Sequence, residues 1–242
     1  RQFFELSKPH IVAPSSWMFT KAQSSPMLCG STISYIPNGI DLNIFKPNPR
    51  SISRALLGVD DSSLIILFIA EKSYPNPRKG TSILREALHL IKNKNVTLLA
   101  VGHHSERWEK VVPIKVYSLG SIADPLLLSH IYSASDFTCI PSVQENLPNT
   151  VIESLACGTP ILGFDSGGIR DGIVHMQTGI LCKERTPQSL ALSIDIFADN
   201  PQLLCSLSEA SRNLAIQRFS ASVEADKILE SCNSAIRHAG HK

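Results

Sequence analysis

Two carboxylates, Glu145 and Glu153, are separated by seven residues and could form the centre of a ligand site. The sequence between them predicts the start of a helix, because Pro148 suits a first helical position and an apolar face follows until Gly158. The apolar run 137–140 just before them predicts a strand. Glu145 is therefore expected in the loop beyond the carboxyl end of that strand, and Glu153 inside the helix.

A helix that starts behind such a loop predicts an anion site. Free N–H groups and the positive dipole end of a helix attract phosphates, and parallel sheets bind ligands beyond the carboxyl ends of their strands. Carboxylates beside a bound sugar nucleotide can accept hydrogen bonds from its hydroxyls. The alternative is that Glu145 is a solvated loop acid and Glu153 an exposed helix residue, the commoner case for an isolated pair. The mouth of the anion site would be formed by Leu147, Pro148, Asn149 and Thr150.

The elements that must position these residues follow a repeating pattern. Short, almost wholly apolar runs alternate with longer amphipathic stretches, which is typical of parallel strands buried on both faces by helices. The predicted strands are 11–13, 33–36, 64–70, 96–101, 116–119, 137–140 and 159–164. The predicted helices are 80–92, 125–135, 187–199, 201–218 and 220–238. The fold class is therefore α/β, a doubly wound parallel sheet with a helical tail after Thr186.

Composition narrows the classes of protein. The chain has 242 residues, of which 43% are hydrophobic and 18% charged, an ordinary globular composition. A net charge of +2 predicts no extended basic surface, so no nucleic-acid partner is expected. The longest apolar run, 64–70, is far shorter than the roughly 18 to 20 residues of a membrane-spanning helix. The six cysteines form no C-x-x-C pair, and reduced thiols in the cytosol are the simplest interpretation.

Several catalytic motifs are missing from the sequence. The glycines within 165–172 do not have the G-x-G-x-x-G spacing of a dinucleotide fold, and there is no P-loop. There is no Asp-x-Asp pair of a metal-dependent transferase and no G-x-S-x-G elbow of an esterase. His103 and His104 lack partners spaced for zinc. We therefore expect no metal and no other cofactor.

The string from Glu145 to Glu153, continuing through 156–161 and Gly167-Gly168, is similar to the E-x7-E motif of family 4 of the retaining glycosyltransferases. The similarity extends to Ile36-Pro-Asn-Gly-Ile-Asp41 and Arg78-Lys79-Gly80, and covers nearly the whole chain. Such enzymes have two facing Rossmann-like domains, the GT-B arrangement, in which the second domain binds the nucleotide sugar. The resemblance implies that this chain is mainly that carboxy-terminal, Rossmann-like half.

The resemblance also implies roles for residues at matching positions. Glu145 would contact hydroxyls of the donor sugar, Glu153 the ribose and Lys79 the diphosphate. Backbone groups of Asn146 to Asn149 would help to hold the phosphates. A cation and a helix end beside a departing nucleoside diphosphate would stabilise its growing charge without a metal. Backbone groups in the loop of Gly120, Ser121 and Ile122 would meet the base.

The sequence departs from the family pattern in two places. Leu147-Pro148 replaces the usual Phe-Gly, and Arg78 adjoins Lys79 instead of preceding it by several residues. Lys72 could reach the phosphate in place of Arg78, which ranks ahead because a guanidinium binds phosphate in a bidentate manner. The plainer alternative is an exposed basic turn before a helix.

Two further positions have open alternatives. Gly167 and Gly168 would either bring backbone N–H groups to the donor or make a tight turn that needs positive φ. Asp171 stands where relatives often have Glu, and its alternatives are a polar role in the site and a helix cap.

The expected organisation has three parts. Residues 1–33 would be a remnant of the amino-terminal, acceptor-side domain and its linker, 34–186 the nucleotide-sugar-binding domain, and 187–242 carboxy-terminal helices. The chain starts with Arg1, and 1–8 lacks the regions of a signal peptide, so the sequence is expected to begin within a longer protein.

The activity implied by the resemblance is transfer of a hexose from a nucleoside diphosphate sugar to an acceptor hydroxyl with retention of configuration, in polysaccharide or glycoconjugate biosynthesis. This chain would supply the donor-binding half and be inactive, or nearly so, alone. A binding module without turnover and a GT-B phosphorylase or epimerase are the alternatives, and the carboxylate motif disfavours the last two.

The expected partners are the nucleotide-sugar donor and an acceptor. The acceptor would be a sugar or a glycolipid, held by the missing amino-terminal domain. Uridine and guanosine donors are both open. A cytoplasmic location is expected, and peripheral contact of the full-length enzyme with the inner face of the membrane is left open.

Overall fold

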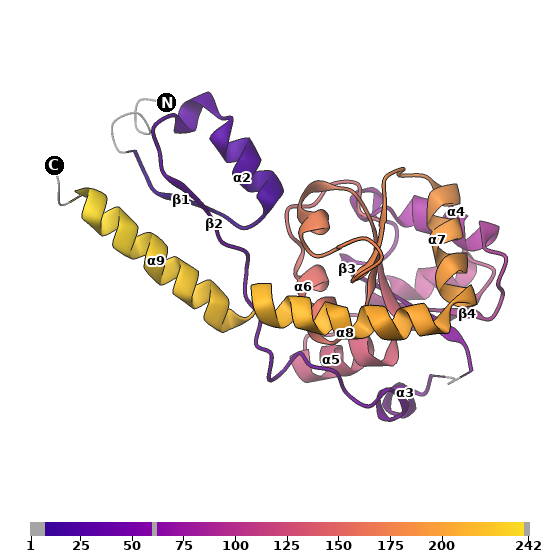
Figure 1. The fold of residues 1–242 in the computed structure, drawn as a ribbon. Coiled ribbons are helices and arrows are strands. Elements are labelled where there is room, and N and C mark those ends of the chain that lie inside the picture. The colour runs from indigo at the N-terminus through magenta and orange to yellow at the C-terminus, as the bar shows by residue number, and fades with distance from the viewer. Residues whose placement is uncertain (1–7, 60–61, 240–242) are drawn as a thin grey trace.

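The computed structural model describes residues 8–59 and 62–239. A small amino-terminal βαβ unit stands beside a larger α/β domain, and the last helix reaches back from the domain to the unit (Figure 1). The domain contains one parallel sheet of six strands with helices on both faces, which confirms the predicted fold class.

The six strands have the order β5-β4-β3-β6-β7-β8. From β3 the chain moves outward through β4 and β5, and then returns to the other side of β3 with β6. The strand order therefore reverses between β3 and β6, the position at which doubly wound sheets open a crevice for ligands. The strands are β3 (Leu64–Lys72), β4 (Val96–His103), β5 (Lys115–Ser118), β6 (Phe137–Ile140), β7 (Ile161–Phe164) and β8 (Gly179–Cys182).

The central strand β3 is apolar on both faces because helices cover both. Ile66 and Phe68 pack with α4 (Thr81–Leu90) and α7 (Pro187–Asp199). Ile65 and Leu67 pack on the other face with α5 (Pro125–Ala134) and α6 (Asn149–Ala156). All four of these β3 side chains are 0 to 2% exposed, so the strand is fixed in the middle of two cores.

The amino-terminal unit has its own two-stranded parallel sheet, in which β1 (Ile11–Ala13) pairs with β2 (Ile33–Tyr35). The helix α2 (Ser16–Gln23) connects the two strands. The predicted boundary between residues 33 and 34 falls within β2, and residues 1–7 lie outside the described part of the chain. The division into domains stays a prediction.

Two chain segments join the unit to the domain, and they lie against each other. Ile40 forms a parallel bridge with Ser220, donating to the Phe219 carbonyl at 2.8 Å and accepting from the Ala221 N–H at 3.0 Å. A Cβ on Gly39 would lie 2.7 Å from the Cα of Ala221, so the crossing segments are in close backbone contact.

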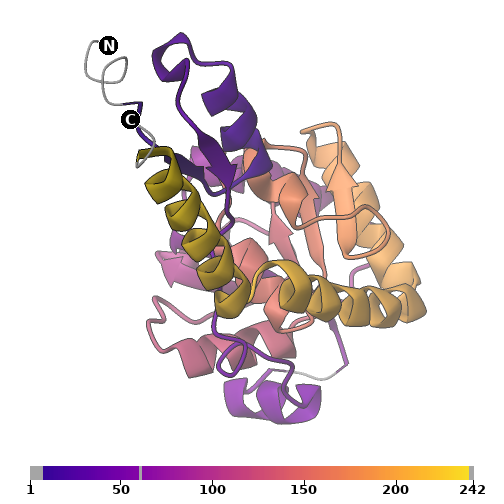
Figure 2. The ribbon, with the colours of Figure 1, turned by 60° about the vertical axis from the view of Figure 1, so that its left-hand side comes forward.

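Beyond this crossing, α9 (Ala221–Ala239) follows α8 (Pro201–Arg218) and runs beside the two-stranded sheet (Figure 2). The hydroxyl of Ser231 lies 2.9 Å from Nε2 of His10. The carboxy-terminal helices therefore belong to both parts of the molecule.

Most predicted elements are present, and the differences have local causes. The strand β8 was not predicted because it starts with a glycine, which interrupts the apolar pattern. The helices α2 and α3 (Arg50–Leu57) were not predicted because polar residues interrupt their apolar positions. Pro148 is extended, with ψ of 140°, and immediately precedes α6, so its prediction as the first helical residue was wrong by one position.

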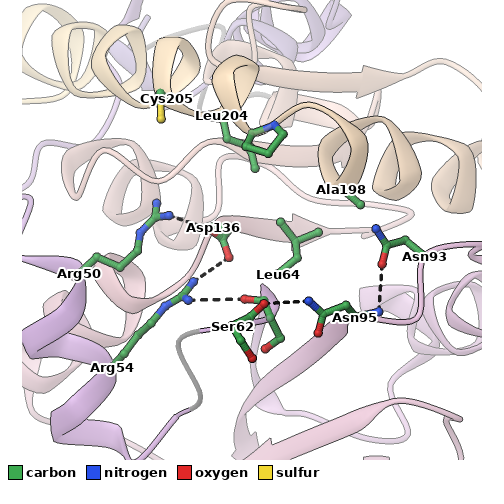
Figure 3. Close-up of a pocket in the computed structure, with 12 residues that line it drawn as sticks. Arg50, Arg54, Ser62, Leu64, Asn93, Asn95, Asp136, Ala198, Leu204 and Cys205 are labelled. Atoms are coloured by element: carbon green, nitrogen blue, oxygen red, sulfur yellow. Dashed lines mark hydrogen bonds and ion pairs between the residues drawn. The ribbon is translucent and has the colours of Figure 1, made fainter.

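The short helix α3 is held to the amino-terminal edge of the sheet by Asp136. This buried carboxylate accepts from Arg54 Nη2 at 2.8 Å, from Arg50 Nη1 at 2.6 Å and from the Ile65 N–H at 2.7 Å. A pocket of about 440 Å³ lies beside this cluster and is also lined by Asn95 (Figure 3). Since Asp136 immediately precedes β6, the cluster lies at the opposite end of the sheet from Glu145 and serves the fold.

At the carboxyl edge, the loops that follow β3 and β6 touch each other. Gly80 has φ of 71°, and a Cβ there would lie 1.9 Å from the carbonyl oxygen of Pro141. The Val143 N–H also donates to the carbonyl of Arg78 at 3.0 Å. Only glycine permits this approach, which sets the distance between the two loops.

Replacing Gly80 with alanine should therefore destabilise the protein more than the same change at another left-handed glycine. Gly58 is the matched control, because it has φ of 63° and a Cβ there would meet nothing within 4 Å. We expect Gly58→Ala to lower the free energy of unfolding by about 1 to 2 kcal/mol, the cost of the left-handed backbone. Gly80→Ala should cost about 3 kcal/mol or more, because a steric clash is added. Urea denaturation measures both, and equal losses would contradict the loop contact.

Candidate functional site

The cationic turn after β3 is a 3-10 helix, η2 (Pro77–Lys79), capped by Asn76. The side-chain oxygen of Asn76 accepts from the Lys79 backbone N–H at 3.3 Å, and the backbone N–H of Asn76 donates to Thr81 Oγ1 at 2.8 Å. The turn therefore has a fixed backbone, which directs Arg78 and Lys79 toward the loop after β6.

Both cations contact Glu145. Lys79 Nζ lies 2.7 Å from Glu145 Oε1, and Arg78 Nη1 lies 2.9 Å from the same oxygen. The side chains of Glu145 and Lys79 are 10% and 15% exposed, whereas that of Arg78 is 59% exposed. Lys79 is therefore the sheltered partner, and Arg78 covers the pair from the solvent side. Lys72 is exposed at the end of β3, where its carbonyl accepts from Asn76 Nδ2 at 3.0 Å.

The turn after β7 packs against the backbone of Glu145 and Asn146 and fixes it. Gly167 has φ of 56°, and a Cβ there would lie 1.8 Å from the Glu145 carbonyl oxygen. A Cβ on Gly168 would lie 2.0 Å from the Asn146 carbonyl oxygen, and the Gly168 N–H donates to Glu145 O at 3.4 Å. The glycine pair thus makes a tight turn in which Gly167 has positive φ, and the N–H of Gly168 is directed at the loop.

The amino-terminal unit contacts the same loop through the start of α2. Ser15 Oγ donates to Asn146 Oδ1, next to Glu145. Asp171, 6% exposed, accepts from the Ser16 N–H at 2.7 Å, from Ser16 Oγ and from the Tyr35 hydroxyl at 3.1 Å. Asp171 therefore caps a helix, although that helix belongs to the amino-terminal unit.

The pKa of the Tyr35 hydroxyl is shifted by burial and by its charged neighbours, Asp171 and Arg218. Burial, followed by the negative charge of Asp171, raises the pKa of Tyr35 to about 12. The guanidinium of Arg218 lies 3.2 Å from the Tyr35 oxygen and acts in the opposite direction. Tyr35 therefore stays a hydrogen-bond donor to Asp171 across the physiological pH range.

The four residues predicted to form the mouth of the anion site lie at the start of α6, but their side chains differ in exposure. The side chain of Leu147 is buried in the core against α6, so only its backbone can face a ligand. Asn149 is exposed, and Pro148 and Thr150 are half-buried. The available groups are therefore backbone atoms and the two polar side chains of the first helical turn.

Glu153 occupies the second turn of α6 and is bonded to a tyrosine. The Tyr132 hydroxyl donates to Glu153 Oε2 at 2.7 Å. Burial raises the pKa of Glu153, and the hydrogen bond from Tyr132 lowers it. Sequence reasoning missed Tyr132 in this role, because the residue has the spacing of an ordinary core position on α5.

A cavity of about 240 Å³ opens beside Glu153. It is lined by Asn149 and Ile152 of α6 and by Gly39, Asp41 and Phe45 of the segment that leads into the domain. Glu153 therefore lines a cavity on the same helix that starts at the cationic loop.

The loop of Gly120, Ser121 and Ile122 lies elsewhere on the same edge of the sheet. It follows β5, two strands from β3, which corresponds to about 10 Å. Gly120 donates to Ser105 Oγ at 3.0 Å and accepts from the Gly102 N–H at 2.6 Å, so its backbone is fixed. The structure does not bring this loop to Glu145, because β4 and β3 lie between β5 and β6 in the sheet.

Within residues 8–59 and 62–239, no three His, Cys, Asp or Glu side chains gather in a way that could hold a metal ion. No helix in this part of the chain is both long and apolar enough to cross a membrane.

A parallel α/β sheet with a charged loop pair at its switch point, beside a helix start, defines the class of Rossmann-like domains. Residues 63–200 match the family glycosyl transferases group 1, and the chain belongs to this family. The resemblance seen in the E-x7-E segment is thereby confirmed at the level of the family.

Curated relatives agree with this family. The chain is 28% identical over 217 residues to a D-inositol 3-phosphate glycosyltransferase of Segniliparus rotundus, a match that covers 85% of this chain and 47% of the relative. It is 29% identical over 220 residues to the protein of that name in Rhodococcus opacus, covering 84% of this chain and 48% of the relative. The chain therefore spans about half the length of these relatives.

Solved structures share the fold. A glycosyltransferase from Rickettsia africae superposes with a TM-score of 0.82 at 23% identity, covering 95% of this chain and 65% of that one. Anabaena Alr3699/HepE in complex with UDP and glucose gives a TM-score of 0.77 at 23% identity, covering 93% of this chain and 63% of that one. These structures confirm the GT-B type of Rossmann-like fold.

The pairing of Lys79 with Glu145 predicts an unusual effect of removing the acid. If Lys79 binds the diphosphate, as the resemblance implies, the diphosphate would compete with the Glu145 carboxylate for Lys79 and be repelled by it. Glu145→Gln should then bind UDP or GDP about fivefold more tightly at low salt. Glu86→Gln is the control, since it removes the same charge from an exposed position on α4. Isothermal titration calorimetry measures both variants. Weaker binding of the free diphosphate by Glu145→Gln would contradict this competition.

Proposed function

We propose that this chain is the donor-binding half of a retaining glycosyltransferase that moves a hexose from a nucleoside diphosphate sugar to an acceptor hydroxyl. The observation that carries the proposal is the meeting of Lys79 and Arg78 with Glu145 at the β3–β6 switch point, beside the start of α6. Because the chain spans about half of its curated relatives, the activity belongs to a longer protein.

The diphosphate is assigned to Lys79, Arg78 and the first turn of α6. When the glycosidic bond breaks, the leaving nucleoside diphosphate gains negative charge. A sheltered ammonium, a guanidinium and the positive end of a helix stabilise that charge in place, with no metal required. No cofactor is proposed.

Glu145 is assigned to the donor sugar. Once a diphosphate engages Lys79 and Arg78, the Glu145 carboxylate loses both of its cationic partners and can accept hydrogen bonds from the sugar hydroxyls. Its backbone is held by Gly167 and Gly168, so the loop that carries the carboxylate keeps its position during this exchange.

The nucleoside is assigned to Glu153 and the loop after β5. Glu153 accepts from the ribose in the cavity beside α6, and the backbone of Gly120 to Ile122 meets the base. The UDP and UDP-glucose complexes of Anabaena Alr3699/HepE favour a uridine donor for this chain too.

The acceptor is assigned to the part of the protein outside this chain. A sugar or glycolipid acceptor in polysaccharide or glycoconjugate biosynthesis fits the family, as does a cytoplasmic enzyme in peripheral contact with the inner face of the membrane. Retention of configuration rests on the resemblance of the Glu145 to Glu153 segment to family 4.

Two substitutions should separate the diphosphate site from the ribose site. Lys79→Ala should weaken binding of both UDP and inorganic pyrophosphate by about tenfold, since it removes the sheltered cation. Glu153→Ala should weaken binding of UDP and leave pyrophosphate unchanged. Lys72→Ala is the control for Lys79, and its effect should stay within about twofold because its side chain is exposed. If both variants titrate like the parent in calorimetry, the assignment is wrong.

The 242-residue chain alone should bind nucleotide but transfer almost no sugar, because the acceptor side is outside it. Incubation with radiolabelled UDP-glucose and GDP-mannose, followed by chromatography, measures transfer and epimerisation. Robust transfer by the purified chain would contradict the assignment of the acceptor side, and an epimerised sugar nucleotide would favour the alternative chemistry.

A further inference from the structure

Tyr132 lies at the end of α5 with its side chain completely buried. Its carbonyl accepts from Thr159 Oγ1 at 2.8 Å and from the Ser135 N–H at 3.1 Å, so its backbone is fixed as well. A buried tyrosine normally directs its hydroxyl to one specific partner. Here that partner is Oε2 of Glu153, at 2.7 Å.

This hydrogen bond gives the two carboxylate oxygens of Glu153 different roles. A glutamate side chain on a helix can rotate about three bonds, and the bond from Tyr132 holds one oxygen in a single position. In the described part of the chain, Oε1 of Glu153 has no hydrogen bond of its own, and the residue lines the cavity with Asn149 and Asp41. Oε1 is thus the oxygen left to accept from a ligand.

The surroundings make the tyrosine matter for charge as well as position. Burial raises the pKa of Glu153, which disfavours the carboxylate, and the Tyr132 hydroxyl is the hydrogen-bond donor that offsets this. Without the hydroxyl, the carboxylate would lose both its orientation and the hydrogen bond that lowers its pKa.

We propose that Tyr132 is a positioning residue that presents Glu153 to the vicinal hydroxyls of the donor ribose, and that this pair makes the chain selective for ribonucleotides over dideoxynucleotides. The inference rests on the proposed function, since it takes the ligand to be a nucleoside diphosphate. It adds a residue from a different helix, α5, to the recognition of the ribose.

A purely structural role for Tyr132, in holding α5 against α6, would have a different signature. Loss of packing would weaken binding of every nucleotide by the same factor. Loss of positioning would weaken binding only of ligands that carry the ribose hydroxyls, because an analogue without them makes no use of Glu153.

The test compares UDP with 2′,3′-dideoxy-UDP in calorimetry, with GDP and ADP and their dideoxy forms in parallel. The parent chain should prefer UDP by about 30-fold, and Tyr132→Phe should bind UDP about tenfold less tightly while its affinity for dideoxy-UDP stays within twofold. The preference should therefore fall to about threefold. Equal loss for both ligands, or no loss for either, would overturn the inference.

The matched control is Tyr35→Phe. It also removes a tyrosine hydroxyl that donates to a carboxylate, but that carboxylate is Asp171, which is outside the cavity beside Glu153. Its preference for UDP over dideoxy-UDP should equal that of the parent, and a similar loss of preference in this variant would contradict a specific role for Tyr132.

A second variant covers the case in which circular dichroism shows that Tyr132→Phe does not fold. Glu153→Gln keeps an oxygen for the Tyr132 hydroxyl and should lose the preference for UDP, whereas retention of the full preference would overturn the inference. If the parent binds none of UDP, GDP and ADP, the proposed function fails and this inference fails with it. If the parent binds UDP but Tyr132→Phe keeps the parent's preference for UDP over dideoxy-UDP, the proposed function stands and the inference alone is wrong.

Discussion

In the loop that follows β3, Gly80 lies so close to the carbonyl of Pro141 that no side chain fits between them. This contact joins the loops on either side of the switch point, and the charges depend on it. An exposed ion pair adds little stability, so the attraction between Arg78 and Glu145 could not hold the loops together by itself. The backbone brings Lys79 to Glu145, and the turn at Gly167 fixes that acid from the other side. The loops at the ends of β3, β6 and β7 thus position the charges of Arg78, Lys79 and Glu145.

Local sequence patterns predicted most strands of the sheet, β3 among them, and missed β8, α2 and α3. The strand β3 is apolar along most of its length because helices cover both of its faces, and it was predicted from that alone. The edge strand β8 and the short helices α2 and α3 depend on contacts with distant parts of the chain. Arg54 of α3, for example, is held by Asp136, which a local pattern cannot reveal.

The same limit applies to the candidate site. Glu145 and Glu153 stand out because their spacing and the helix start between them are local features. The meeting of Lys79 with Glu145 depends on β3 and β6 being neighbours, and strand order is a property of the whole sheet. Tyr132 has the spacing of a core residue, and only the adjacency of α5 and α6 shows that its hydroxyl serves Glu153.

The paired crossing between the amino-terminal unit and the domain has a mechanical consequence. The chain passes between the two bodies twice, and both passages meet where Ile40 bridges Ser220. Two bodies whose connecting segments meet at one place can turn about that place, whereas sliding them apart would break both hydrogen bonds of the bridge. Close contact of Gly39 with Ala221 leaves no slack there. Any such turn must also break the hydrogen bonds of Ser15 with Asn146 and of Ser16 with Asp171, so the orientation of the unit and the loop of Glu145 are coupled.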